Sequence, residues 1–222
     1  MILFLLAVVA GYLLGALPFG YLVARAQGVD IFKVGSGNPG ATNVKRVLGA
    51  KAGYTVYVLD ALKGAVAAGW PLLYARLQHP AITTDDAGSN LGAIDGSLAA
   101  AVLGLVAAVL GHSFSCFTRF KGGKGVATAS GGLLMLMPAP ILIGAAVWFV
   151  ICFTSRYVSL ASILASITVP AAAWMLGLPL MLKIVATLLG VVVILRHHAN
   201  IRRLIAGTEH RWERRPADQK DS

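Results

Sequence analysis

Residues 125–154, GVATASGGLLMLMPAPILIGAAVWFVICFT, decide how often this chain crosses a membrane. The stretch is apolar almost throughout, and it is longer than the ~20 residues that one transmembrane helix needs. Pro138 and Pro140 lie near its middle, where proline removes helical hydrogen bonds. The stretch can therefore form one long helix, or two short helices that separate at the sequence MPAP.

The composition indicates that the chain resides in a lipid bilayer. Of its 222 residues, 57% are hydrophobic and 13% are charged, whereas about a quarter of the residues in soluble domains are charged. We therefore predict an all-α, polytopic integral membrane bundle formed by one domain over residues 1–222, with a flexible polar tail at 211–222. Cys116 and Cys152 lie in unrelated contexts, which disfavours a disulfide or a metal site.

Seven apolar segments are candidate membrane spans. The first could be a signal peptide, but no basic residue precedes it and its apolar run continues to Ala24, so a retained helix is favoured. The predicted spans cover residues 2–24, 53–75, 91–111, 125–137, 139–154, 157–176 and 179–195.

The distribution of basic residues predicts the topology. Lysine and arginine gather in segments 25–51 and 112–124 and in the tail from Arg196, whereas the loop 76–90 holds one arginine and two aspartates. Basic loops stay in the cytoplasm, so all three basic segments should share a side. Splitting the chain at MPAP satisfies this rule, which gives seven spans, an external N-terminus and a cytoplasmic C-terminus. Five or six spans remain the alternative.

The net charge of +10 follows from the same bias and from attraction to anionic lipid head groups, so it gives no reason to expect a nucleic-acid partner. Scattered basic residues do not explain the glycine, asparagine, serine and histidine residues between them. These residues point to a function at the cytoplasmic face.

The first basic segment contains VGSGNPGATNVKR, residues 34–46. Its small residues and Pro39 prevent a regular helix before about Ala41. Glycine allows backbone N–H groups to turn toward an anion, and Arg46 can grip a phosphate with two donors. The candidate anion ligands are Gly35, Ser36, Gly37, Asn38, Gly40, Thr42, Asn43 and Arg46. The alternative is a polar turn that caps the following helix.

The second basic segment contains GHSFSCFTRFKGGKGVATASGG, residues 111–132. It is not a nucleotide P-loop, because Gly125 and not serine or threonine follows Lys124. Gly122, Gly123 and Gly125 instead predict a backbone nest at the start of an apolar helix, where the helix dipole favours an anion. His112 is a candidate general base, or else a structural residue near a helix end.

The third basic segment reads RHHANIRRLIAGTE, residues 196–209. In a helix, His197, Asn200 and Arg203 would lie on nearby faces. The alternative is an amphipathic interfacial helix with a basic face. Asp60 and Lys63 lie three residues apart inside a predicted span, where charges are costly; they predict a structural ion pair or part of the site.

Together, the motifs SGNPGATNVKR, GHSFSCFTRFKGGKGVAT and HHANIRRLIAGTE resemble those of the bacterial membrane acyl-phosphate:glycerol-3-phosphate acyltransferases, the PlsY family. Their order and spacing agree over nearly the whole chain. Two positions depart from the usual family pattern, which has proline at Ser115 and arginine at His198, and they put local contacts in doubt.

The resemblance implies transfer of an acyl group from acyl phosphate to the 1-hydroxyl of glycerol 3-phosphate, giving lysophosphatidic acid and phosphate. It implies a bacterial inner-membrane enzyme with a cytoplasmic active site and without cofactor or metal. Its implied partners are the two substrates, the bilayer and the enzyme that makes acyl phosphate. The implied catalytic residues are Ser36, Arg46, Lys124, His197 and Asn200, and the implied substrate-binding residues are Gly37, Asn38, Gly40, Thr42, Asn43, His112, Gly122, Gly123, Gly125, Thr128, Gly207 and Glu209.

Several alternatives stay open. The proton acceptor is either a histidine, His112 or His197, or a phosphate oxygen of a substrate, which we favour. No histidine is followed after four residues by aspartate, which disfavours acyl-CoA or acyl carrier protein as the donor. A phosphate-solute transporter would place its polar groups near the bilayer midplane, and a basic membrane scaffold would leave the glycines unexplained.

Overall fold

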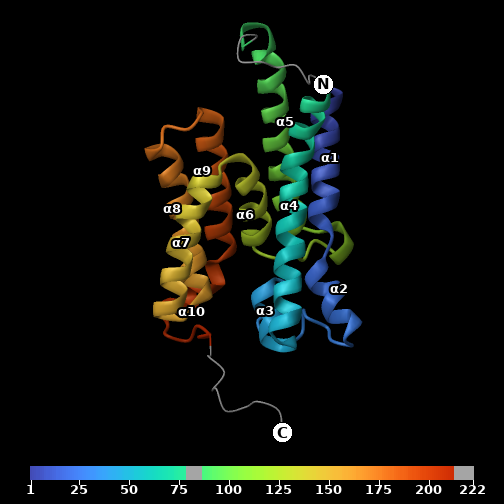
Figure 1. The fold of residues 1–222 in the computed structure, drawn as a ribbon. Coiled ribbons are helices and arrows are strands. Elements are labelled where there is room, and N and C mark those ends of the chain that lie inside the picture. The colour runs from blue at the N-terminus through green and yellow to red at the C-terminus, as the bar shows by residue number, and fades with distance from the viewer. Residues whose placement is uncertain (79–86, 213–222) are drawn as a thin grey trace.

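The computed structural model describes residues 1–78 and 87–212, with side chains excluded from 87 to 95. Residues 79–86 of the predicted loop 76–90 therefore lie outside the described residues, as do 213–222 of the predicted tail. Every regular element in the described part is a helix, which confirms the all-α prediction (Figure 1). The helices are α1 (Ile2–Ala16), α2 (Phe19–Ala26), α3 (Ala41–Leu48), α4 (Ala50–Gln78), α5 (Ala87–Ser113), α6 (Val126–Leu136), α7 (Pro138–Ser155), α8 (Val158–Met175), α9 (Leu180–Arg196) and α10 (His198–Ile205), with a short 3₁₀ turn η2 (Cys116–Thr118).

The predicted break at MPAP is confirmed. The helix α6 ends at Leu136 and α7 begins at Pro138, which occupies the first helical position. Proline suits that position because its missing N–H would have no helical partner there. The first predicted span is also interrupted, because α1 ends before Pro18 and α2 begins at Phe19.

The number of membrane crossings stays a prediction. Among the described residues, five segments are long and apolar enough to span a membrane, or six if α9 and α10, which bend by 58°, form one span. The helix α6 has 11 residues, so it is only ~16 Å long at 1.5 Å per residue. That length is about half of the hydrocarbon thickness, and it explains why the count falls below seven.

Small residues let the helices approach closely. A Cβ atom on Gly64 of α4 would collide with the carbonyl of Thr128 on α6, and one on Gly11 of α1 would collide with Gly104 of α5. Such contacts are typical of membrane helices, where packing and not burial from water drives association. The close α4–α6 crossing fixes the N-terminal end of α6, which directly follows residues 121–125, KGGKG, called the glycine-rich loop below.

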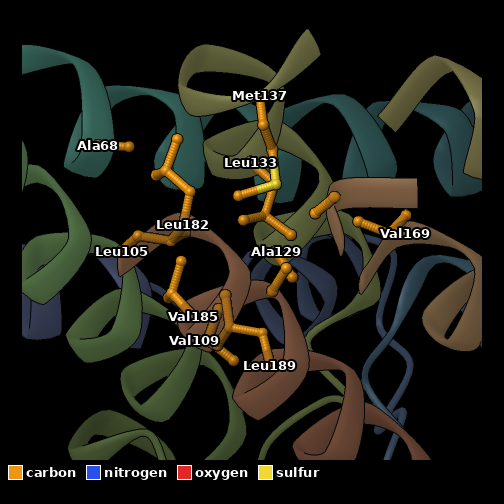
Figure 2. Close-up of a cluster of buried hydrophobic side chains, with 12 residues drawn as sticks. Ala68, Leu105, Val109, Ala129, Leu133, Met137, Val169, Leu182, Val185 and Leu189 are labelled. Atoms are coloured by element: carbon orange, nitrogen blue, oxygen red, sulfur yellow. The ribbon is translucent and has the colours of Figure 1, made fainter. Parts of the chain in front are cut away.

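A hydrophobic core joins α6 to its neighbours (Figure 2). Leu105 and Val109 of α5, Leu133 of α6 and Val185 and Leu189 of α9 are all buried in one cluster. This cluster links the helices before and after the glycine-rich loop to α9, which ends directly before the third motif.

The three basic segments lie toward one end of the bundle, opposite the N-terminus, as predicted (Figure 1). That this end faces the cytoplasm stays a prediction. The flexible tail over 211–222 stays a prediction, and the structure describes only its first two residues. Arg211 donates to the hydroxyl of Tyr157 at 2.9 Å, and the backbone N–H of Trp212 donates to the carbonyl of Arg156 at 2.7 Å.

Candidate active site

Lys124 lies at the centre of the polar end of the bundle. Its Nζ atom donates to Oδ1 of Asn200 at 2.6 Å, and Nδ2 of Asn200 donates to Oε1 of Glu209 at 2.6 Å. Arg203 holds the other oxygen of Glu209 at 2.7 Å. The predicted positions in the second and third motifs therefore meet in one chain of hydrogen bonds, although 76 residues separate Lys124 from Asn200.

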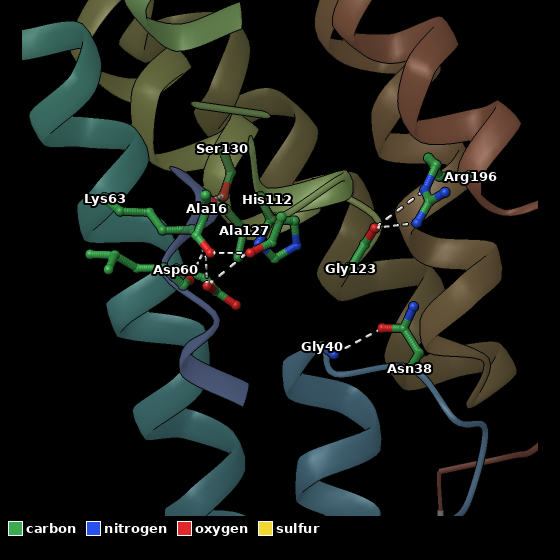
Figure 3. A network of polar contacts seen from close by, with 12 residues as sticks. Ala16, Asn38, Gly40, Asp60, Lys63, His112, Gly123, Ala127, Ser130 and Arg196 are labelled. Carbon is green, nitrogen blue, oxygen red and sulfur yellow. Dashed lines mark hydrogen bonds and ion pairs between the residues drawn. The ribbon is translucent and has the colours of Figure 1, made fainter. Parts of the chain in front are cut away.

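The glycine-rich loop is held from both sides (Figure 3). The backbone N–H of Gly123 donates to the carbonyl of His112 at 3.1 Å, so this donor of the predicted backbone nest is already occupied. On the other side, the guanidinium of Arg196 donates to the carbonyls of Gly122 at 3.2 Å and Gly123 at 3.0 Å. Gly125 then adopts φ +83° immediately before α6, a conformation that glycine adopts without strain.

The first motif is organised by Asn43, which is buried at the start of α3. Its Oδ1 atom accepts from the backbone N–H of Ser36 at 2.8 Å and from Nη1 of Arg46 at 3.1 Å. Its Nδ2 atom donates to the carbonyl of Val34 at 3.1 Å. The predicted start of this helix near Ala41 is confirmed, and Asn43 joins the loop and the arginine into one unit.

The remaining first-motif residues shape the loop. Oδ1 of Asn38 accepts from the backbone N–H of Gly40 at 2.8 Å, in the turn before α3. Gly37 has φ +66°. Thr42 is exposed on the first turn of α3.

Cations surround Lys124 in the folded chain. Burial lowers the pKa of Lys124 to about 8; Glu209 opposes this shift, whereas Arg203, Arg46 and Arg196 add to it. These arginines come from α3, α9 and α10, so the fold gathers positive charge from three elements around one lysine.

Glu209 is the carboxylate that faces these cations. Burial alone would raise its pKa, but hydrogen bonds from Asn200, Arg203 and Ser159 outweigh burial and lower it. Glu209 therefore stays ionised near neutral pH and holds Asn200 and Arg203 in place.

His197 is buried at the break between α9 and α10. Its Nδ1 atom lies 2.7 Å from the carbonyl of Val193. A carbonyl only accepts hydrogen bonds, so Nδ1 carries the proton, and Nε2 is the ring atom that remains for other partners.

Asp60 and Lys63 form the predicted ion pair, with 2.7 Å between Oδ1 and Nζ. His112 joins this pair, because its Nδ1 atom lies 3.5 Å from the same oxygen of Asp60. This three-residue network lies on the far side of the glycine-rich loop from Arg196 (Figure 3).

Two predicted substrate-binding residues, Thr128 and Gly207, form no hydrogen bond to the described residues around Lys124 that would assign them a role. The buried hydroxyl of Thr128 on α6 has no hydrogen-bond partner within the described part of the chain. Gly207 forms the turn after α10 with φ +69°. Among the described residues, no group of three histidine, cysteine, aspartate or glutamate side chains could hold a metal ion.

Two residues that hold the site together, Ser159 and Arg196, are not among the predicted site residues. The hydroxyl of Ser159, on α8, donates to Oε1 of Glu209 at 2.8 Å, and nothing near Ser159 in the sequence indicates this contact. Arg196 clamps the glycine-rich loop. Arg196 is the first residue of the third basic segment, directly before the third motif, and this position was the signal that could have identified it.

Comparisons with known proteins agree with the three motifs. A family model for glycerol-3-phosphate acyltransferase matches residues 5–207. A glycerol-3-phosphate acyltransferase of Aquifex aeolicus is 43% identical over 208 residues, covering 94% of this chain and 98% of that protein. One from Bacillus cytotoxicus is 42% identical over 209 residues, with 94% of each chain covered.

Solved structures show the same fold. A crystal structure of PlsY, an integral membrane glycerol 3-phosphate acyltransferase in its glycerol 3-phosphate form, superposes with a TM-score of 0.80 at 40% identity, covering 95% of this chain and 96% of that one. Its lysophosphatidic acid form gives a TM-score of 0.78. The chain described here is an integral membrane acyltransferase that belongs to the glycerol-3-phosphate acyltransferase family.

Proposed function

We propose that this enzyme transfers an acyl group from an acyl phosphate to the 1-hydroxyl of glycerol 3-phosphate, releasing lysophosphatidic acid and inorganic phosphate. The observation that carries the proposal is Lys124, a half-buried amine bonded to Asn200 and surrounded by Arg46, Arg196 and Arg203. Such a cluster is costly when empty, because like charges repel. Two phosphate groups would neutralise it.

The two phosphates have separable binding regions. The acyl-phosphate head would occupy the glycine-rich loop, with Gly122, Gly123 and Lys124, and would also contact Ser36 and Thr42 of the first motif. Glycerol 3-phosphate would be held by residues that converge from the first and third motifs, namely Arg46, His197 and Asn200, together with Lys124.

The chemistry needs little beyond positioning and charge. The 1-hydroxyl oxygen forms a bond to the acyl carbonyl carbon, and the bond from that carbon to the phosphate oxygen breaks. Phosphate leaves with the bonding electron pair, and a phosphate oxygen of a substrate takes the hydroxyl proton. Lys124 stabilises the charge that develops on the leaving phosphate, and the two phosphate regions hold the reacting atoms close together.

An acyl phosphate fits the site better than a thioester donor. Its head is a phosphate, which basic side chains such as Lys124 bind well, and its chain can remain in the bilayer. The PlsY structures are a glycerol 3-phosphate form and a lysophosphatidic acid form, which supports the acceptor and the product. We place the enzyme in a bacterial inner membrane with this site at the cytoplasmic face, because the basic segments gather there.

The test uses purified enzyme in detergent or in vesicles. Acyl phosphate and glycerol 3-phosphate are supplied together in one reaction, and acyl-CoA replaces acyl phosphate in a parallel one. We expect phosphate release that depends on glycerol 3-phosphate and matches lysophosphatidic acid formed. If lysophosphatidic acid forms with acyl-CoA but not with acyl phosphate, the donor assignment is wrong, whereas glycerol 3-phosphate remains the acceptor.

A further inference from the structure

His112 packs directly against the glycine-rich loop, through both its ring and its backbone. A Cβ atom on Gly123 would collide with Nε2 of the His112 ring, so the ring occupies the place that a side chain at 123 would take. The carbonyl of His112 also accepts the backbone N–H of Gly123 at 3.1 Å. With Arg196 donating to the carbonyl of Gly123 at 3.0 Å, Gly123 is held between the backbone carbonyl of His112 and the guanidinium of Arg196, and the His112 ring packs against its Cα.

The His112 ring is itself held from behind. Its Nδ1 atom lies 3.5 Å from Oδ1 of Asp60, and Lys63 pairs with that oxygen at 2.7 Å. Nζ of Lys63 also donates to the carbonyl of Leu17 at 3.0 Å, at the break between α1 and α2. The network therefore ties the glycine-rich loop to α1, α4 and α5.

The network is shielded from solvent. The side chains of Asp60 and Lys63 are each 3% exposed and that of His112 is 9% exposed. Buried charges need their partners, because removing one leaves the other uncompensated. The network also forms one wall of a small pocket whose lining includes Lys121, Gly122 and Gly123.

We propose that Asp60, Lys63 and His112 form a positioning network that sets the place of Gly123 and, through the next peptide bond, of Lys124. His112 then acts on the reaction through the loop, which differs from its sequence-based assignment to substrate binding and from a role as general base. Its two ring nitrogens face Asp60 and Gly123. The effect on the reaction rests on the proposed function, in which Lys124 holds both phosphates.

A misplacement of about 1 Å in a reacting group can lower a rate by about 10²-fold. The network therefore matters for turnover even though its members need not touch a substrate. His112→Gln keeps a polar side chain of similar size against Gly123, and we expect it to stay within about tenfold of the wild-type rate, since loss of a general base costs about 10²-fold or more.

The first test is a size swap at the contact. Gly123→Ala should displace the loop, because the new methyl group meets the His112 ring. Adding His112→Ala removes the ring, so the double variant should recover about tenfold or more in kcat/KM over Gly123→Ala alone, as coupled neighbours do. Gly123 has no positive φ, so alanine is compatible with its backbone.

Gly122→Ala is the matched control. A Cβ atom there would meet the carbonyl of His112 and the backbone of Ser113, which His112→Ala does not remove. We therefore expect no rescue of Gly122→Ala by His112→Ala. Equal rescue at both glycines, or additive losses for Gly123→Ala and His112→Ala, would overturn the proposal.

The second test removes the charges together. Asp60→Leu/Lys63→Met replaces the ion pair by apolar side chains of similar volume, a change that buried pairs often tolerate. With folding checked by thermal melting, we expect kcat to fall and the KM for glycerol 3-phosphate to rise, each by about tenfold. A folded double variant with wild-type kinetics would contradict the proposal. If the double variant does not fold, the size swap decides.

A readout without the donor separates this proposal from the proposed function. Reductive methylation, followed by peptide mass spectrometry, compares Lys124 with exposed Lys51 in the same molecule. The methylation rate of Lys124 should rise in Gly123→Ala and in Asp60→Leu/Lys63→Met. It should fall again in Gly123→Ala/His112→Ala. If wild-type enzyme ignores acyl phosphate but this labelling pattern holds, the donor is wrong and the positioning network stands. An unchanged pattern would overturn the network.

Discussion

Lys124 illustrates how the fold alters one side chain. An ordinary lysine amine has a pKa near 10.5, and burial among three arginines lowers it to about 8 here. The lysine is thus charged below pH 8 and loses its proton as the pH rises through that value. A phosphate bound beside it would favour the charged form and so raise its pKa.

This shift predicts the basic side of the pH profile. Because only protonated Lys124 can stabilise phosphate charge, kcat/KM should fall as the pH rises above about 8. Lys124→Arg keeps its charge far above that pH, so its residual activity should not fall there. Lys124→Ala should lose about 10²-fold or more in kcat at every pH. The measurement is kcat/KM from pH 6 to 10; a basic limb retained in Lys124→Arg would assign it to another group.

The acidic residues predict that a divalent metal is dispensable. Magnesium is usually held by one or two carboxylates together with substrate phosphates. Glu209 is already bonded to Asn200, Arg203 and Ser159, and Asp60 is paired with Lys63. Activity should therefore persist in excess chelator. Loss of activity with EDTA that magnesium restores would show that the cations of the site do not suffice.

Some contacts of the site could be predicted from the sequence, and others could not be predicted. Asp60 and Lys63 pair because they lie three apart on one helix, a spacing that sequence reveals. His112 joins them from a different helix, and Ser159 reaches Glu209 across 50 positions. Such contacts depend on how the helices pack, which no local pattern encodes.

At the level of elements, proline marked one break clearly. The MPAP break was predicted because two prolines lie in the apolar stretch and because splitting it there keeps the three basic segments on one side of the membrane, and α7 begins at Pro138. Pro18 breaks the first span in the same way. That break was missed because the apolar run continues past it without a change in composition.

At the α4–α6 crossing, Gly131 should not tolerate a larger side chain. A Cβ atom on Gly131 of α6 would collide with the carbonyl of Ala61 on α4. Gly131→Ala should therefore force the helices apart and cost about 1–3 kcal/mol, as overpacking does. Because α6 carries the glycine-rich loop at its N-terminal end, activity should fall as well.

Gly69→Ala on α4 is the control for this substitution. Its Cβ atom would meet only the flexible end of Met135 at 3.4 Å, so stability and activity should stay close to wild type. Thermal melting in detergent and the standard assay compare the two variants. Equal melting temperatures would show that the crossing tolerates a wider spacing.

At the scale of the molecule, the segment after α10 ties two parts of the bundle together. The Trp212 ring packs on Phe153 of α7 with 5.6 Å between centroids, and Nζ of Lys45 lies 4.9 Å from its centre. Lys45 belongs to α3, so this segment joins α3 to the α7–α8 connection at the end that holds the site. The sequence suggested only a polar tail here, because a lone tryptophan among charged residues has no periodic pattern.

The orientation of the whole molecule is the last prediction. In the seven-span topology the end that holds Lys124 faces the cytoplasm, and the α8–α9 connection faces the other side. Cys116 is exposed near the glycine-rich loop, whereas Cys152 is buried and should stay silent. An impermeant thiol reagent should therefore label Cys116 in inverted membrane vesicles but not in intact cells. Leu176, 52% exposed at the end of α8, provides the opposite probe: Leu176→Cys in a Cys116→Ser background should be labelled in intact cells with a permeable outer envelope. Labelling of both positions from one side would exclude this topology, because the path from Cys116 through α6, α7 and α8 must cross the membrane an odd number of times.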